Sequence, residues 1–202
     1  MPEIRWVGVI RDPDVYESGR LPENAVKMKM PESIQTAALP FMVLPALLCI
    51  GSVVLKSYFS RQNIVHPLWL FAGVAIGFLL FPLHEFLHAV VYPRGAQVFL
   101  GVVPKQLSAA ALVSHPLRRR RFLLMCVLPV ILGLIPLLLF WTAPAADPAR
   151  NSLFFGAAVL GMVSPYPDFY NAYQALKQAP KQAYIQFEHG DTYYFEAADR
   201  AE

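Results

Sequence analysis

Three side chains that could bind a metal ion and use it chemically lie within five residues: His84, Glu85 and His88. On an α-helix, residues four apart lie about 40° apart around the axis and one turn along it, so both imidazoles can reach one ion. Zinc accepts neutral imidazole ligands and keeps one position for water. Glu85, rotated by about 100°, would lie beside that water and can act as a general base. The spacing therefore predicts a zinc site that activates water.

The apolar surroundings of this motif favour the metal hypothesis. Placing an ionisable side chain in hydrocarbon costs about 2.5–3.5 kcal/mol, so three such groups within five residues need a partner, and a metal ion is sufficient. The alternative is that Glu85 pairs with the two histidines without a metal, or that the motif lies in the interfacial layer. Only the metal hypothesis requires a third protein ligand at the same depth.

Asp168 is the candidate third ligand, because it is the only acidic residue in the last long apolar run. It follows the Ser-Pro-Tyr-Pro stretch at 164–167, which disturbs a helix, and the competing interpretation is a solvated residue at a frayed helix end. Asn171, three residues later on nearly the same face, could hydrogen-bond a ligand or the substrate backbone. His115 could also approach the site, although it precedes a proline in a loop.

The elements that must position these residues are four long apolar runs, each close to the ~20 residues that cross ~30 Å of hydrocarbon. They are Ala37–Tyr58, Pro67–Val91, Phe122–Trp141 and Ser152–Tyr173. Of the 202 residues, 56% are hydrophobic and 15% are charged, against about 25% charged in a typical soluble domain. The sequence therefore predicts an all-α membrane protein with four transmembrane helices, and a lipid bilayer as its surroundings.

Basic residues predict the orientation of these helices. The connection between the second and third runs carries Arg94, Lys105 and four consecutive arginines at 118–121, whereas the other short connections carry few basic residues. Lys and Arg are retained on the cytoplasmic side, so we expect a cytoplasmic loop at 94–121 and both termini on that side of a bacterial-type plasma membrane. Topology and contact with anionic lipid explain the arginines better than nucleic acid does, and no nucleic-acid partner is expected.

Outside the apolar runs, short stretches alternate like strands. Ile4–Ile10, Tyr184–Phe187 and Tyr193–Phe195, with a turn at 189–191, predict a small cytoplasmic β element made from the two termini. Ala96–Val103 and Ser108–His115, joined through Pro104 and Lys105, predict a hairpin. The expected organisation is an N-terminal segment 1–36, a transmembrane domain 37–176 and a C-terminal segment 177–202 with a possible β-hairpin.

The motif at 84–88, the basic loop, a third run that contains Pro129 and a late Asp168 resemble the putative zincin peptidase family of small membrane proteins. That family is similar in plan to the site-two proteases, which are intramembrane zinc metalloproteases. The likeness covers roughly residues 60–180. It implies zinc held by His84, His88 and Asp168, with Glu85 activating water.

We therefore expect an integral membrane zinc metallopeptidase that hydrolyses a membrane-protein or peptide substrate at or within the cytoplasmic leaflet. The hairpin at 96–115 could pair with an unwound substrate by β-augmentation. The main alternative is a non-catalytic membrane protein with a structural, sensory or transport metal site, although a closed structural site would usually add a fourth protein ligand. A second alternative is a helix-bundle scaffold that binds a partner through its termini. The sequence does not fix the oligomeric state.

Overall fold

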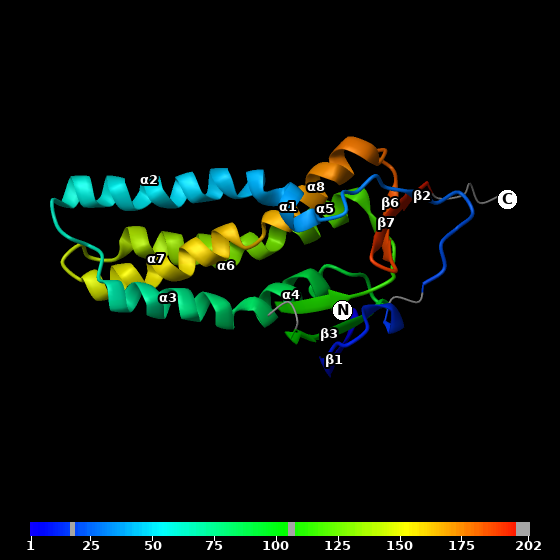
Figure 1. Ribbon diagram of the computed structural model, residues 1–202, viewed down its shortest axis with the longest axis horizontal. Helices are drawn as coiled ribbons and strands as arrows, with labels where there is room; N and C mark the ends of the chain where they lie inside the picture. The colour runs from blue at the N-terminus through cyan, green and yellow to red at the C-terminus, as the bar shows by residue number, and fades with distance from the viewer. Residues whose placement is uncertain (17–18, 105–107, 197–202) are drawn as a thin grey trace. The chain divides into compact units, whose positions relative to one another are not determined.

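The computed structural model describes residues 1–16, 19–104 and 108–196, and its contacts divide the chain into two units (Figure 1). We call residues 35–84 and 129–167 the helix unit, and residues 1–34, 85–128 and 168–202 the strand unit. The expected segments 1–36, 37–176 and 177–202 concern position relative to a membrane, and they stay a prediction.

Four main helices form the helix unit: α2 (Val43–Ser60), α3 (Pro67–Leu79), α6 (Ile131–Thr142) and α7 (Pro148–Val163), preceded by the short α1 (Ile34–Ala38) and the 3-10 turn η2 (Leu39–Met42). Near the end of α2, the Lys56 ammonium donates to the carbonyl of Ala143 (2.8 Å) and to the side chain of Asn151 (2.6 Å). Near the start of α6, Gly133 contacts Met162 at the end of α7. Helices α2 and α6 therefore run in one direction and α7 runs in the other.

Glycines allow α3 and α7 to approach each other closely. A side chain on Gly73 of α3 would collide with the backbone carbonyl of Leu153 on α7, and a Cβ on Gly77 would lie 2.9 Å from the Leu160 side chain. Gly77 and Leu160 both come later in their helices than Gly73 and Leu153, so α3 and α7 run parallel. Small residues at helix contacts are typical of packing within membranes.

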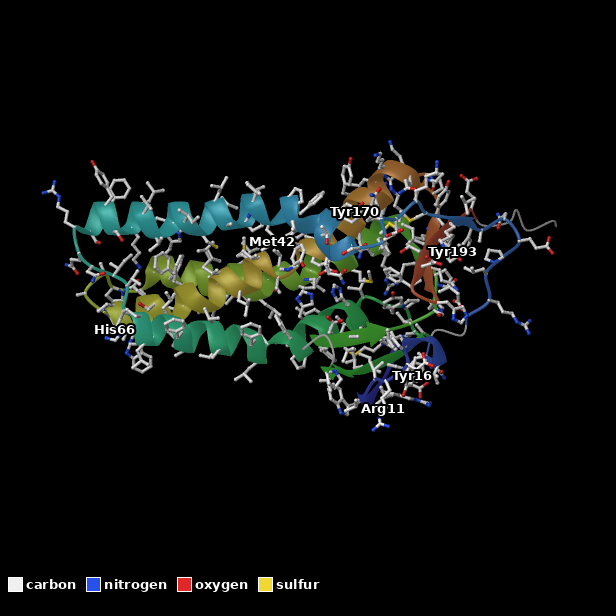
Figure 2. All side chains as sticks on the ribbon, in the orientation of Figure 1. Arg11, Tyr16, Met42, His66, Tyr170 and Tyr193 are labelled. Atoms are coloured by element: carbon white, nitrogen blue, oxygen red, sulfur yellow. The ribbon has the colours of Figure 1, made fainter. Side chains whose placement is uncertain are left out.

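Three helical stretches are long and apolar enough to cross a membrane: Ile34–Ser60, Pro67–Val90 and Arg119–Thr142. Each agrees within three residues with one of the first three predicted runs. Side chains project outward along α2 and α3 (Figure 2), and exposed apolar residues such as Leu44, Ile50 and Phe71 are common on these helices. Length, composition and surface together indicate membrane association.

The fourth predicted run, Ser152–Tyr173, is not one helix, so four transmembrane helices are not confirmed. Helix α7 ends at Val163, and a separate helix α8 (Tyr166–Gln178) begins after Ser164 and Pro165. Pro165 and Pro167 lack the N–H group that a continuous helix needs. With 16 residues, α7 is about 24 Å long, which is shorter than the ~30 Å of a hydrocarbon core.

The strand unit contains two sheets, so the expectation of an all-α fold with small β elements understated the β-structure. One sheet has the order β1 (Glu3–Val9), β3 (Gln97–Val103), β4 (Ser108–Leu112). The other has the order β2 (Val26–Lys27), β7 (Asp191–Phe195), β6 (Tyr184–Glu188), β5 (Leu117–Arg118). Alternation in sequence located the longer strands, but it specifies which face is buried and not which strand is the partner.

Strand pairing corrects one expectation and confirms another. Strand β1 pairs in parallel with β3, starting at Glu3 opposite Gln97, and not with the C-terminal strands. The two ends of the chain do meet, but through β2 and β7. The predicted hairpin is present as the antiparallel pair β3–β4, and Lys105 in its connection lies outside the described residues.

The β6–β7 hairpin turns at the predicted place. His189 and Gly190 have φ of 48° and 73°, and Glu188 pairs with Asp191. Two successive residues with positive φ are the mark of a type I′ turn, which matches the twist of the strands it joins. Glycine at the second position adopts this conformation without steric cost.

A shared core fixes the helices of the strand unit. Helix α5 (Arg119–Val127) buries Phe122, α8 buries Ala175 and β6 buries Ile185 in one hydrophobic cluster. Ala89 of α4 (Phe81–Val90) belongs to the same cluster. The residues of α4, α5 and α8 that lie in the strand unit are therefore positioned by one core.

Candidate metal centre

The predicted metal-binding motif lies on α4, a helix that begins after a local break. Pro82 has no N–H group, so it cannot bond to the carbonyl of Phe78, and the regular helix is interrupted at Leu80. The N–H of His84 then donates to the carbonyl of Leu80 at 2.9 Å, and the helix continues. Proline just before the motif thus separates α3 from the turn that carries the histidines.

Helix α4 brings three potential ligand groups together. One ligand atom from each of His84, Glu85 and His88 lies within 4.8 Å of the other two. His84 and His88 are 9% and 8% exposed, whereas Glu85 is half-buried. Because these residues belong to one helical turn, their proximity is set by the helix itself.

His88 is oriented by a backbone carbonyl. Its Nδ1 lies 3.0 Å from the carbonyl oxygen of Met125 on α5, so the neutral ring donates through Nδ1 and keeps a lone pair on Nε2. Pro129 explains why this carbonyl is available: it stands four residues after Met125, where a helical N–H would otherwise occupy the oxygen. In many proteins a hydrogen-bond acceptor for the ring nitrogen that does not face the metal fixes the tautomer of a metal-binding histidine.

Asp168 meets His88 on that other nitrogen. Its Oδ2 lies 3.6 Å from His88 Nε2, and the carboxylate is largely buried. Asp168 stands in the first turn of α8, where the helix dipole favours a negative charge. Two ligand atoms of one tetrahedral zinc ion are about 3.4 Å apart, given bonds of about 2.0–2.2 Å. The distance within this one pair and the chemistry of the donors therefore fit zinc, whereas the group whose ligand atoms all lie within 4.8 Å of one another is His84, Glu85 and His88.

Glu85 is held by the neighbouring sheet. The backbone N–H of Ala111, on strand β4, donates to Glu85 Oε2 at 2.9 Å. A carboxylate has about four acceptor sites on its two oxygens, so this bond orients the group without exhausting its capacity. The general-base candidate thus points toward an edge strand.

The other two predicted site residues lie in different settings. Asn171 is on α8, three residues after Asp168, and its buried Oδ1 has no hydrogen-bond partner among the described residues. His115 lies between β4 and β5 and is not part of the ligand group on α4. Burial, and then the charge of Arg121, lower the pKa of His115.

Sequence alone did not predict two groups of the site, the Met125 carbonyl and the Ala111 N–H, and both belong to the backbone. The carbonyl of Met125 leaves no signature in residue type, but Pro129 four positions later could have indicated it. The N–H of Ala111 depends on how the β3–β4 hairpin packs beside α4, and no local pattern reports that packing.

Comparison with known proteins agrees with the motif. A family model described as "Putative zincin peptidase" matches residues 77–184, just over half of the chain, and this range contains His84, Glu85, His88 and Asp168. No curated protein and no solved structure matches. The similarity in plan to site-two proteases therefore stays a prediction. Because this model matches more than half of the chain and spans every helix from α4 to α8, the chain belongs to the family of putative zincin peptidases.

Proposed function

We propose that the protein is a membrane zinc metallopeptidase that cleaves peptide bonds at or within the cytoplasmic leaflet. The observation that carries the proposal is the approach of Asp168 to within 3.6 Å of His88 Nε2. The two residues stand 80 positions apart, on different helices, and the need of zinc for a third protein ligand predicts Asp168, the only acidic residue of its apolar run. Membership of the zincin peptidase family supports the same chemistry.

Each residue has a distinct role in this proposal. His84, His88 and Asp168 would hold the ion, and the Met125 carbonyl keeps His88 in the tautomer that exposes Nε2. Bound zinc would supply Lewis acidity, which lowers the pKa of water toward about 7 and polarises the scissile carbonyl. Glu85 takes the proton from the attacking water and returns it to the leaving amine.

The edge of β4 offers a place for the substrate backbone. Strand β4 is the last strand of its sheet, and Ala111 directs its N–H away from β3, toward Glu85. Because backbone groups alternate sides along a strand, Ala109 presents its own N–H and carbonyl on the same edge. An unwound substrate that added to this edge would run beside the general base.

We further propose that the chain crosses the membrane four times. The antiparallel path of α6 and α7 within the helix unit supports a fourth crossing, although α7 alone is short. The basic loop then lies in the cytoplasm, and the site next to it lies on the cytoplasmic side of the membrane. Membrane proteins or peptides that reach this leaflet would be the substrates.

The test compares the wild-type protein with Glu85→Gln, both purified as full chains in detergent. Zinc is measured by elemental mass spectrometry, and cleavage is measured on fluorescently labelled casein, whose unfolded backbone suits an edge strand. We expect equal zinc in the two proteins and a loss of cleavage of at least about 100-fold in Glu85→Gln, as general bases contribute about 10²–10⁴-fold. His88→Ala should lose both properties.

Other outcomes would overturn parts of this proposal. Zinc without cleavage in the wild type and in Glu85→Gln would favour a structural, sensory or transport site. The absence of zinc from the wild type, even after zinc is added back, would leave only a pairing of Glu85 with the histidines.

A further inference from the structure

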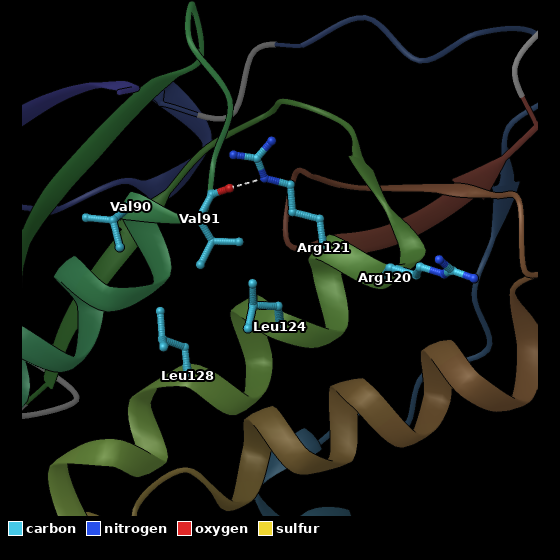
Figure 3. A pocket seen from close by; sticks show the side chains of 6 residues that line it. All are labelled: Val90, Val91, Arg120, Arg121, Leu124 and Leu128. Carbon is cyan, nitrogen blue, oxygen red and sulfur yellow. Dashed lines mark hydrogen bonds between the residues drawn. The ribbon is translucent and has the colours of Figure 1, made fainter.

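An open groove lies beside the end of α4, separate from the candidate ligands. Six residues line it: Val90, Val91, Arg120, Arg121, Leu124 and Leu128. Its volume is about 580 Å³, enough for a molecule of small to moderate size. Figure 3 shows Arg121 reaching toward the backbone carbonyl of Val91, and the two leucines following each other along the chain below it.

The arginines around this groove have no anionic partner within the described part of the chain. Arg118 donates to the Tyr184 hydroxyl, Arg119 to a backbone carbonyl and Arg121 to the carbonyl of Val91. Arg120 is exposed and makes no polar contact with a described residue. The partners of Arg118, Arg119 and Arg121 are all neutral oxygens, so no described contact neutralises the positive charge of the arginines.

The helix itself adds to this positive charge. The four arginines occupy the N-cap and first turn of α5, which contains no acidic residue and no side-chain cap. The dipole of a helix makes its N-terminus positive, so basic side chains at this position are unfavourable unless an anion is present. A negatively charged group at the mouth of the groove would therefore stabilise these charges.

The position of the groove identifies the anion. One candidate membrane span ends at Val90 and another begins at Arg119, so when these spans cross a bilayer the groove lies where hydrocarbon gives way to lipid headgroups. Below the arginines its wall is apolar, and Leu124 is 55% exposed. A free inorganic anion makes no favourable contact with an apolar wall, whereas the acyl chain of a lipid packs against it.

We propose that this groove binds an anionic phospholipid. The lipid phosphate lies at the mouth of the groove, which Arg120 and Arg121 line, and the first part of an acyl chain lies against Leu124 and Leu128. The inference rests on membrane association and not on peptidase activity, so it can fail while the proposed function holds, and the reverse.

The experiment measures lipid binding to the full chain by native mass spectrometry from detergent. Titrations use phosphatidylglycerol, zwitterionic phosphatidylcholine and inorganic phosphate as a competitor. Arg120→Gln is the principal variant, because Arg120 supports no other described residue and its loss should not affect folding. Arg118→Gln is the matched control: it removes the same charge two residues away, from a side chain that does not line the groove.

We expect phosphatidylglycerol to bind more tightly than phosphatidylcholine, and inorganic phosphate not to displace it. Arg120→Gln should weaken binding of phosphatidylglycerol about fivefold, and Arg120→Gln/Arg121→Gln about thirtyfold, from the usual contribution of a juxtamembrane arginine. Arg118→Gln should remain within about twofold of the wild type.

Three results would overturn the proposal. Equal binding of the two lipids would show that headgroup charge is not recognised. Equal losses in Arg118→Gln and Arg120→Gln would indicate diffuse attraction to the basic segment and no groove. Displacement of the lipid by inorganic phosphate would assign the arginines to a soluble anion.

Discussion

His88 illustrates how a backbone group that is not itself a candidate ligand can orient a side chain that could bind a metal. One ring nitrogen meets the Met125 carbonyl and the other meets Asp168. The carbonyl is available because Pro129 cannot donate to it. A proline between α5 and α6, far from the motif in sequence, thereby contributes to the orientation of an imidazole on α4.

This dependence predicts an effect of Pro129→Ala on metal binding. Alanine restores an N–H that can bond to the Met125 carbonyl, and the helix then competes with His88 for the same oxygen. We expect zinc affinity to fall about 10–100-fold, the usual effect of losing such a partner. Competition with a calibrated chelator measures it on purified protein.

Pro136→Ala is the matched control, because Pro136 also lies inside an apolar helix and the carbonyl four residues before it belongs to Leu132. Its zinc affinity should equal that of the wild type. If both alanine variants bind zinc as tightly as the wild type, the carbonyl does not orient His88 in the way we infer.

At the scale of elements, α7 is the helix that depends most on close packing. It lies against α3 and α6 through glycines, and a side chain on Gly156 would collide with the backbone carbonyl of Leu70. No rotamer relieves a clash between a Cβ atom and a backbone oxygen, so the helices themselves must separate.

We therefore predict that Gly156→Ala destabilises the purified protein by about 1–3 kcal/mol, the usual cost of overpacking. Thermal unfolding in detergent measures the change as a lower Tm. Gly51→Ala on α2 is the control, since a Cβ there meets nothing within 4 Å, and its Tm should not fall. A Tm for Gly156→Ala at or above the wild-type value would mean that α3 and α7 are not in contact.

Sequence located the elements better than it located their partners. Three apolar runs were found within three residues of their ends, because hydrophobicity sustained over about 20 residues is a strong local signal. The fourth was misjudged, because average hydrophobicity does not register that Pro165 divides it. Pairing of β1 with β3 joins segments about 90 residues apart, and alternation alone does not specify a partner.

The candidate site shows the same division between local and distant information. The motif on α4 is local, and its grouping follows from helical periodicity alone. Asp168 was found because it is the only acid in its run, and the structure brings it to His88. The hydrogen bond from Ala111 to Glu85 requires the hairpin to pack beside the helix, and that information is spread over the whole strand unit.

At the scale of the whole molecule, the distribution of basic residues predicts how the chain lies in a membrane. The connection between α2 and α3, residues 61–66, carries Arg61 as its only lysine or arginine, whereas four consecutive arginines begin at Arg118. Retention of Lys and Arg on the cytoplasmic side predicts that the second connection, and the site beside it, lie on the cytoplasmic side of the membrane.

Labelling of single introduced cysteines with a membrane-impermeant maleimide tests this topology in intact cells. The native Cys49 and Cys126 are 2% and 0% exposed, so they should give little background. Gln62→Cys, exposed between α2 and α3, should react in intact cells. Gln97→Cys at the start of β3 and Lys181→Cys after α8 should react only once the membrane is permeabilised, since four crossings put both on the inner side. If Lys181→Cys reacts in intact cells as Gln62→Cys does, while Gln97→Cys does not, α7 does not cross the membrane. If Gln97→Cys reacts in intact cells, the peptidase site lies on the outer face.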